Sequence, residues 1–115
     1  MNKTYFTSIC IVLALALPYN SANAVPKDTI CKPHNVVVWN VKPRVHVQCT
    51  AAVSGIKYFA FPSDDAHAVA RVLTILTAAR ASGADLVINY DPADTSGAAK
   101  GCNASDCRLI RAIGF

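Results

Sequence analysis

The sequence contains no glutamate, so its seven acidic residues are all aspartates, set against eleven Lys and Arg residues. The formal net charge is only +4, and the chain has no internal repeat, no low-complexity tract and no block of like charges. Proteins that bind nucleic acid usually carry a dense basic patch, which this sequence lacks. We therefore expect no nucleic-acid partner and only a weak electrostatic preference for acidic partners.

Recognisable catalytic and cofactor motifs are also missing. The chain has no G-x-S-x-G turn of the kind that presents a nucleophilic serine. Cys102 and Cys107 are separated by four residues, whereas a redox pair is separated by two. A zinc site drawn from Cys31, His34, Cys102 and Cys107 would have loose ligand spacing. The sequence thus predicts no metal, no cofactor and no catalytic residue.

No apolar run is long enough to cross a bilayer as a helix, which takes about 20 residues. The apolar run at residues 8–17 follows Lys3 and precedes Pro18, and small residues stand at Ala22 and Ala24. These features are typical of a cleaved signal peptide with an A-x-A site, and they disfavour the alternative of an uncleaved anchor. We predict a signal peptide over 1–24, one small domain over 25–115, no membrane span after cleavage and a secreted or periplasmic location.

Cysteine usage supports the same location. Of five cysteines, Cys10 lies in the predicted signal peptide and four remain in the domain. An even number in a small exported domain indicates two disulfides, which compensate for a marginal core. Three connectivities are possible, and the sequence alone does not select one. Two of them are Cys49–Cys102 with Cys31–Cys107 and the local pairs Cys31–Cys49 and Cys102–Cys107.

The pattern of apolar residues predicts five strands and one helix. The strands are expected over 36–41, 44–50, 56–61, 85–91 and 107–115, and the helix over 62–83. Residues 25–35 contain two prolines and are expected to be irregular. The order β-β-β-α-β-β indicates an α+β fold. We expect a small five-stranded antiparallel OB-like sheet or barrel that carries one amphipathic helix and two disulfides.

The start of the helix can be interpreted in two ways. Ser63 is the predicted N-cap, with Asp64 and Asp65 in the first turn where the helix dipole favours negative charge, and Gly83 ends the helix. Alternatively, His67 with Asp64 or Asp65 forms the active site of a small hydrolase. Capping explains the same residues without catalysis, so it is the preferred interpretation.

The third predicted strand carries aromatic side chains on both faces. Lys57, Phe59 and Phe61 alternate with Tyr58, so the two sets point to opposite sides of the sheet. A sheet covered by one helix cannot bury both sets. We therefore predict that either the face with Lys57, Phe59 and Phe61 or the polar loop 92–106 binds a glycan or a protein.

Four segments carry a resemblance to known proteins: "RVHVQC", "IKYFAFP", "LTAARASGADLVINYD" and "CRLIRAIGF". The chain resembles a group of small exported bacterial proteins of poorly known function and, more remotely, the B subunits of AB5 toxins of the subtilase-cytotoxin and pertussis type. The latter resemblance implies an OB-type fold, homo-oligomers and host-glycan ligands. The resulting prediction is an exported, non-enzymatic binding module. A periplasmic inhibitor or immunity-type protein and the small hydrolase are the alternatives.

Overall fold

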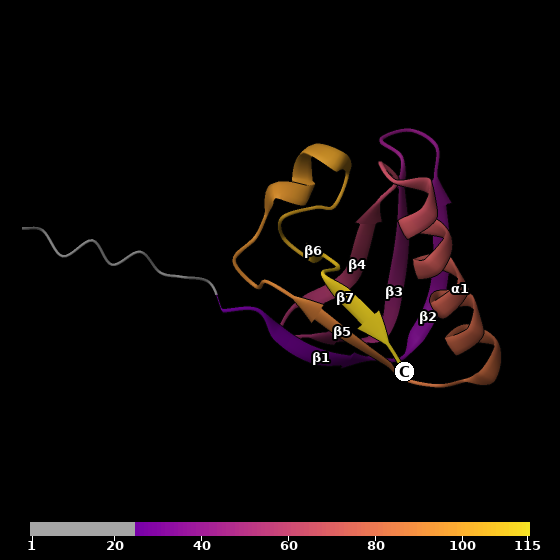
Figure 1. The fold of residues 1–115 in the computed structure, drawn as a ribbon. Coiled ribbons are helices and arrows are strands. Elements are labelled where there is room, and N and C mark those ends of the chain that lie inside the picture. Colours follow the sequence, from indigo (N-terminus) through magenta and orange to yellow (C-terminus); the bar gives the residue numbers. More distant parts are fainter. Residues whose placement is uncertain (1–24) are drawn as a thin grey trace, which may run out of the picture.

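The computed structural model describes residues 25–115, and the predicted signal peptide, residues 1–24, lies outside the described residues. The described part forms seven strands, one α-helix and one 3-10 helix (Figure 1). In chain order they are β1 (Lys27–Cys31), β2 (Pro33–Trp39), β3 (Arg44–Val53), β4 (Ile56–Pro62), α1 (Ala66–Ser82), β5 (Leu86–Tyr90), η1 (Ser96–Lys100), β6 (Cys107–Leu109) and β7 (Ala112–Gly114). Within residues 25–115, no helix combines the length and the apolar character needed to cross a membrane.

The strands form two sheets, which confirms the α+β class but not a single OB-like sheet. Sheet A has the order β1-β5-β7 and is antiparallel, whereas sheet B has the order β2-β3-β4-β6 and includes a parallel pair, β4 with β6. The sheets do not close into a barrel, so the expected five-stranded antiparallel sheet or barrel is wrong in this respect.

Two features of the chain explain the difference. Residues expected to be irregular form β1, which pairs with β5 from Lys27 to Cys31. The predicted last strand is divided: the backbone N–H of Ile110 donates to Ala60 of β4, and that of Arg111 donates to Asn89 of β5. The C-terminal segment therefore passes from sheet B to sheet A within two residues.

The core lies between α1 and the inner faces of both sheets. Alternation in β3 turns Val45, Val47 and Cys49 inward, as predicted. Phe59 and Tyr90 pack edge to face there, with ring centroids 5.0 Å apart. A second, smaller cluster covers the opposite face of sheet B and consists of Ala60, Cys102 and Cys107, with Tyr58 and Leu109 against it.

The helix begins later than predicted. Asp65 is the N-cap, because its carboxylate accepts hydrogen bonds from the backbone N–H groups of His67 (2.9 Å) and Ala68 (3.2 Å). Ser63, the predicted cap, lies in the preceding turn, where its N–H donates to Pro43. Gly83 ends the helix as expected, with φ +71°.

Both predicted disulfides are present, and the pairing is local: Cys31–Cys49 and Cys102–Cys107. The pairing that joined Cys49 to Cys102 is wrong for a simple reason. Cys31 and Cys49 belong to the main core, whereas Cys102 and Cys107 lie on the other side of sheet B. The sheet itself separates the two pairs of cysteines.

Candidate binding site

The strand register of sheet B gathers aromatic and polar side chains on the face that points away from the main core. Arg44 lies opposite Trp39, and Tyr58 lies opposite Gln48. His46 stands between them on β3, with its neighbours Val45 and Val47 turned inward. Because alternate strand residues share a face, the outward face of β3 consists of Arg44, His46 and Gln48.

Three rings follow one another across this face. The ring centroids of Trp39 and His46 are 6.4 Å apart, and those of His46 and Tyr58 are 6.2 Å apart. The rings form one wall of a shallow groove of about 290 Å³. The groove is completed by Gly101, Asn103 and Asp106, from the segment between η1 and β6, and by Cys107, the first residue of β6.

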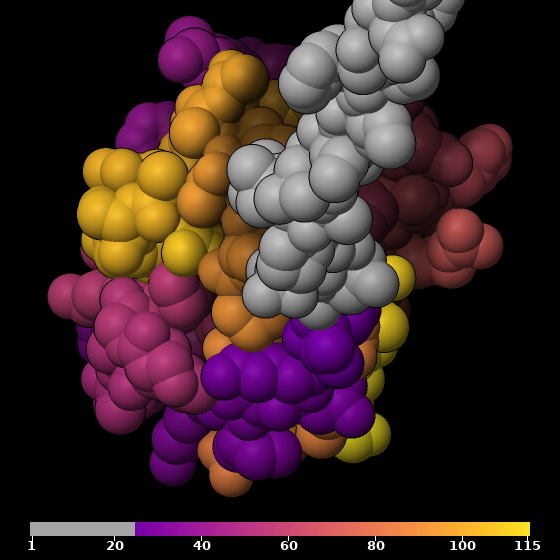
Figure 2. Space-filling model, turned by 90° about the vertical axis from the view of Figure 1, so that its left-hand side faces the viewer, coloured from indigo at the N-terminus to yellow at the C-terminus, as the bar shows by residue number. Residues whose placement is uncertain are grey.

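The Cys102–Cys107 disulfide closes the tight loop that supplies the polar wall of the groove. The backbone carbonyl of Asp106 accepts hydrogen bonds from Lys57 (2.8 Å) and Tyr58 (3.0 Å), which ties the loop to β4. Figure 2 shows the loop between β5 and β6, in orange and gold, beside the β3–β4 turn in magenta. Within residues 25–115, no hydrogen bond occupies the Asp106 carboxylate or the Asn103 side-chain amino group, so both remain available to a ligand.

Arg44 supports the aromatic wall of the groove. Its side chain is 9% exposed, and its Nη1 donates to the backbone carbonyls of Val41 (3.0 Å) and Lys42 (2.9 Å). The guanidinium lies 4.8 Å from the centroid of the Trp39 ring, a cation–π distance. In the described part of the chain the only ion pair joins Lys100 to Asp64, so Arg44 has no carboxylate partner there.

His46 is held as a neutral ring. Its Nε2 accepts a hydrogen bond of 2.8 Å from Nε of Arg44. Burial, followed by the nearby Arg44 charge, lowers the pKa of His46 to about 4, although the Asp106 charge acts in the opposite direction. At neutral pH this imidazole is therefore uncharged, and because Arg44 occupies its Nε2 lone pair, His46 presents an aromatic surface to the groove.

The predicted binding face does not exist as an exposed surface. Phe59 is fully buried against Tyr90, and Phe61 packs against the main core. Lys57 alone is exposed, with its Nζ 5.9 Å from the centroid of the Tyr58 ring. The alternation in β4 was identified correctly, but the face assigned to solvent is the face that packs beneath α1.

The residues of the hydrolase alternative are used elsewhere. The Asp65 carboxylate caps α1, and the Asp64 carboxylate lies 2.6 Å from Nζ of Lys100. The His67 side chain is exposed and makes no hydrogen bond to either aspartate within residues 25–115. In the same residues, no group of three His, Cys, Asp or Glu side chains is placed to hold a metal ion.

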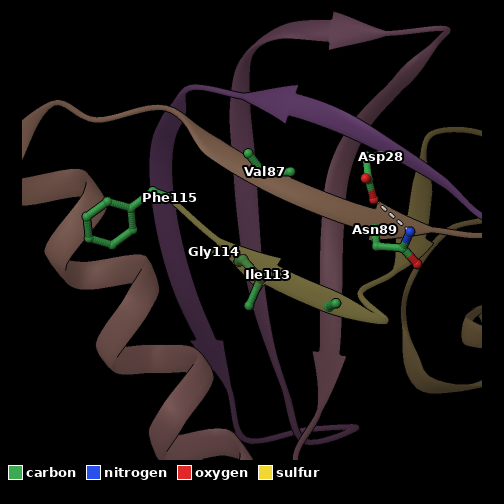
Figure 3. Close-up of a pocket in the computed structure, with 7 residues that line it drawn as sticks. Asp28, Val87, Asn89, Ile113, Gly114 and Phe115 are labelled. Atoms are coloured by element: carbon green, nitrogen blue, oxygen red, sulfur yellow. Dashed lines mark hydrogen bonds between the residues drawn. The ribbon is translucent and has the colours of Figure 1, made fainter.

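A second groove, of about 350 Å³, lies on the outer face of sheet A (Figure 3). Val87, Gly114 and Phe115 line its apolar part. At the other end Asn89 donates a hydrogen bond of 2.7 Å to Asp28, drawn as a dashed line. Its polar groups thus satisfy each other, in contrast to Asn103 and Asp106, so the aromatic groove of sheet B is the better candidate for a polar ligand.

The aromatic groove was not predicted from the sequence, because the groove depends on the register of the β2–β3 hairpin. Pairing Trp39 with Arg44 requires a turn at residues 40–43, and a turn there would have placed Trp39 beside His46. Asn103 and Asp106 belong to the loop that the Cys102–Cys107 disulfide closes, a pairing that the sequence left open. Comparison with protein-family models, curated proteins and solved structures finds no match for this chain.

Proposed function

We propose that the protein is an exported, non-enzymatic binding module that holds a hydroxyl-rich ligand, such as one sugar ring of a glycan, in the aromatic groove. The observation that carries the proposal is the combination of a ring wall, Trp39–His46–Tyr58, with two unoccupied polar groups on Asn103 and Asp106. Sugar rings present an apolar C–H face and a polar hydroxyl edge, so a groove with one wall of each kind is complementary to them.

The size and rigidity of the groove support a small ligand. Its volume of about 290 Å³ lies at the lower end of the range found for small-molecule sites. Arg44 immobilises the ring wall and the Cys102–Cys107 disulfide immobilises the polar wall. A site that is ordered before binding loses less conformational entropy when the ligand arrives.

The proposed location follows from the signal-peptide prediction for residues 1–24 and is supported by the two disulfides, which persist in oxidising compartments. The resemblance to toxin B subunits, which bind host glycans, also favours a sugar ligand. Whether the protein assembles into homo-oligomers, as those subunits do, is part of this proposal and is read from the mass of the protein in solution.

The test is a glycan array followed by calorimetry with the oxidised protein purified after export. We expect at least one glycan to bind, and Trp39→Ala and Asp106→Asn each to weaken binding tenfold or more. The matched controls are Asp85→Asn, a substitution of an exposed aspartate outside the groove, and Phe115→Ala, a substitution of the exposed residue that follows β7.

Three results would overturn the proposal. Glycan binding that is unchanged in Trp39→Ala and Asp106→Asn would place the ligand elsewhere. Hydrolysis of a bound glycan that disappears in His67→Ala would show an enzyme that uses the start of α1. Absence of any glycan ligand, together with capture of one secreted enzyme, would favour the inhibitor alternative.

A further inference from the structure

The middle ring of the aromatic wall, His46, is held by a hydrogen bond that exists only while the imidazole is neutral. Nε2 of His46 accepts this bond from Nε of Arg44 over 2.8 Å. A guanidinium carries donors only and keeps its charge throughout the accessible pH range, so Arg44 cannot become the acceptor. Protonation of Nε2 would set two donors and two positive charges against each other. The hydrogen bond must then break.

Arg44 is the partner that stays in place when the bond breaks. Its side chain is buried, and Nη1 donates to the backbone carbonyls of Val41 and Lys42. The guanidinium also lies over the Trp39 ring. None of these contacts depends on the protonation of His46. The imidazole, which is only half-buried, is therefore the group that moves.

Asp106 is the acceptor for a protonated His46. It lines the same groove, and within residues 25–115 its carboxylate has no hydrogen bond and no ion pair. The Asp106 charge favours the protonated imidazole, against burial and the Arg44 charge. The rings on either side of His46, from β2 and β4, carry no charge. Lys57 is exposed, with its Nζ 5.9 Å from the centroid of the Tyr58 ring.

We propose that the Arg44–His46 hydrogen bond is an acid-sensitive switch of the aromatic groove: protonation releases the imidazole from Arg44 and pairs it with Asp106. The row of rings is then interrupted, because His46 leaves its place between Trp39 and Tyr58. The Asp106 carboxylate is at the same time no longer free for a ligand. Acid therefore lowers the affinity of the groove. The switch itself does not depend on the ligand, whereas the loss of affinity rests on the proposed function.

The first test uses the exported, oxidised protein without ligand. An NMR titration follows the imidazole nitrogens of His46 and the Nε–H of Arg44. Trp39 is the only tryptophan in the chain, and its ring centroid lies 6.4 Å from that of His46, so its fluorescence reports on the same change. We expect all three signals to change together near pH 4, because burial lowers the pKa of His46 to about 4. Far-UV circular dichroism should stay constant over the same range.

Three variants identify the groups involved. The side-chain oxygen of His46→Gln accepts a hydrogen bond from Arg44 but does not titrate, so the Trp39 and Arg44 signals should stay constant with pH. His67→Gln, at an exposed position of α1, is the matched control and should keep the transition. In Asp106→Asn the His46 midpoint should move to lower pH, because the charge that favours the imidazolium is gone.

The second test measures affinity by calorimetry with the glycan that binds most tightly on the array. If only the protein with neutral His46 binds, the affinity should fall about twofold from pH 7 to pH 4 and about tenfold from pH 7 to pH 3. His46→Gln keeps the Asp106 carboxylate and should lose less affinity over the same range.

Four results would overturn the switch. The first is a Trp39 or Arg44 signal that changes equally in the unmodified protein and in His46→Gln. The second is a change in circular dichroism that accompanies the transition, because it would show unfolding instead. The third is a His46 midpoint that stays in place in Asp106→Asn, and the fourth is an equal pH dependence of glycan affinity in the unmodified protein and in His46→Gln. Absence of any glycan ligand would overturn the proposed function alone, since the first test uses no ligand.

Discussion

The backbone of Gly101 lies directly against the guanidinium of Arg44, and a Cβ atom at position 101 would overlap Cζ and Nη1 of that side chain. Gly101 also has φ +89°, a conformation that L-residues rarely adopt. The contact links the end of η1 to the Arg44 side chain that supports Trp39 and His46. The two walls of the aromatic groove are therefore fitted to each other through a position that accepts only glycine.

Replacing Gly101 by alanine should lower the free energy of unfolding by about 2–3 kcal/mol, because backbone strain adds to the displacement of Arg44. Gly55→Ala is the control: Gly55 has φ +79°, but nothing lies within 4 Å of a Cβ there, so strain alone of about 1 kcal/mol is expected. Urea denaturation measures both values. Equal losses for the two variants would contradict the close contact with Arg44.

Tyr90 offers a test of the core. Its ring is buried, and its hydroxyl has no hydrogen-bond partner within residues 25–115. Leaving a buried hydroxyl unpaired costs about 1–3 kcal/mol, so Tyr90→Phe should be neutral or raise the free energy of unfolding by about 1 kcal/mol. Thermal or urea denaturation checks this, with Tyr58→Phe on the groove face as the control. A loss above about 1 kcal/mol would mean that a buried water satisfies the hydroxyl.

His46 makes stability depend on pH. Because burial lowers its folded-state pKa from 6.5 to about 4, the unfolded chain binds one more proton between these values. Stability is then complete above pH 6.5 and falls as the pH drops toward 4. We expect a loss of about 1–2 kcal/mol after allowance for solvent screening.

Denaturation curves at several pH values measure the dependence. The loss attributable to His46 should be absent in His46→Phe, which keeps a ring in the groove, and present in His67→Gln. An NMR titration of the unmodified protein that places the His46 midpoint near 6.5 would contradict the expectation.

The two disulfides should contribute differently. Removing Cys31–Cys49, which closes 18 residues, should cost about 3 kcal/mol, and removing Cys102–Cys107, which closes 5 residues, about 2 kcal/mol. Only the second removal should weaken ligand binding in the aromatic groove, because it releases Asn103 and Asp106. Paired cysteine-to-alanine variants compared by denaturation and calorimetry measure both effects. Equal ligand affinity in the two double variants would show that the loop keeps its shape without its disulfide.

Two substitutions at the start of α1 distinguish the observed N-cap, Asp65, from the predicted one, Ser63. Asp65→Ala should lower the free energy of unfolding by about 1 kcal/mol, since two backbone N–H groups lose their acceptor. Ser63→Ala, which removes only a hydroxyl outside the helix, should have a much smaller effect. The reverse order in chemical denaturation would move the N-cap back to Ser63.

Local sequence patterns predicted the individual strands and the helix better than they predicted how these elements assemble into sheets. The alternation of "RVHVQC" placed Val45 and Val47 in the core, and Gly83 marked the end of α1. The division of the last strand at Ile110 depends on two long-range hydrogen bonds to Ala60 and Asn89, which leave no local signal in the sequence. β1 lies between Pro26 and Pro33, and its pairing with β5 is likewise a tertiary effect that the local sequence does not indicate.

The candidate site was harder to predict for a related reason. Which face of β4 packs beneath α1 is decided by its register against β3, where Phe59 pairs with Val47. The alternation alone does not show which face of β4 is buried, so it did not decide whether Phe59 or Tyr58 faces solvent. One known cross-strand pair, Trp39 with Arg44, would have fixed the whole outer face.

The order of the strands along the chain has a consequence for the order in which the two sheets can form. β2, β3 and β4 are consecutive and joined by short turns, so this part of sheet B can form as soon as residue 62 is available. β1 precedes them, yet its partner β5 begins only at Leu86, and β7 ends at Gly114. Sheet A therefore cannot be completed until the residues up to Gly114 are available for folding. During that interval Cys31 and Cys49 are already present, and their oxidation would hold β1 beside β3 until its partner arrives.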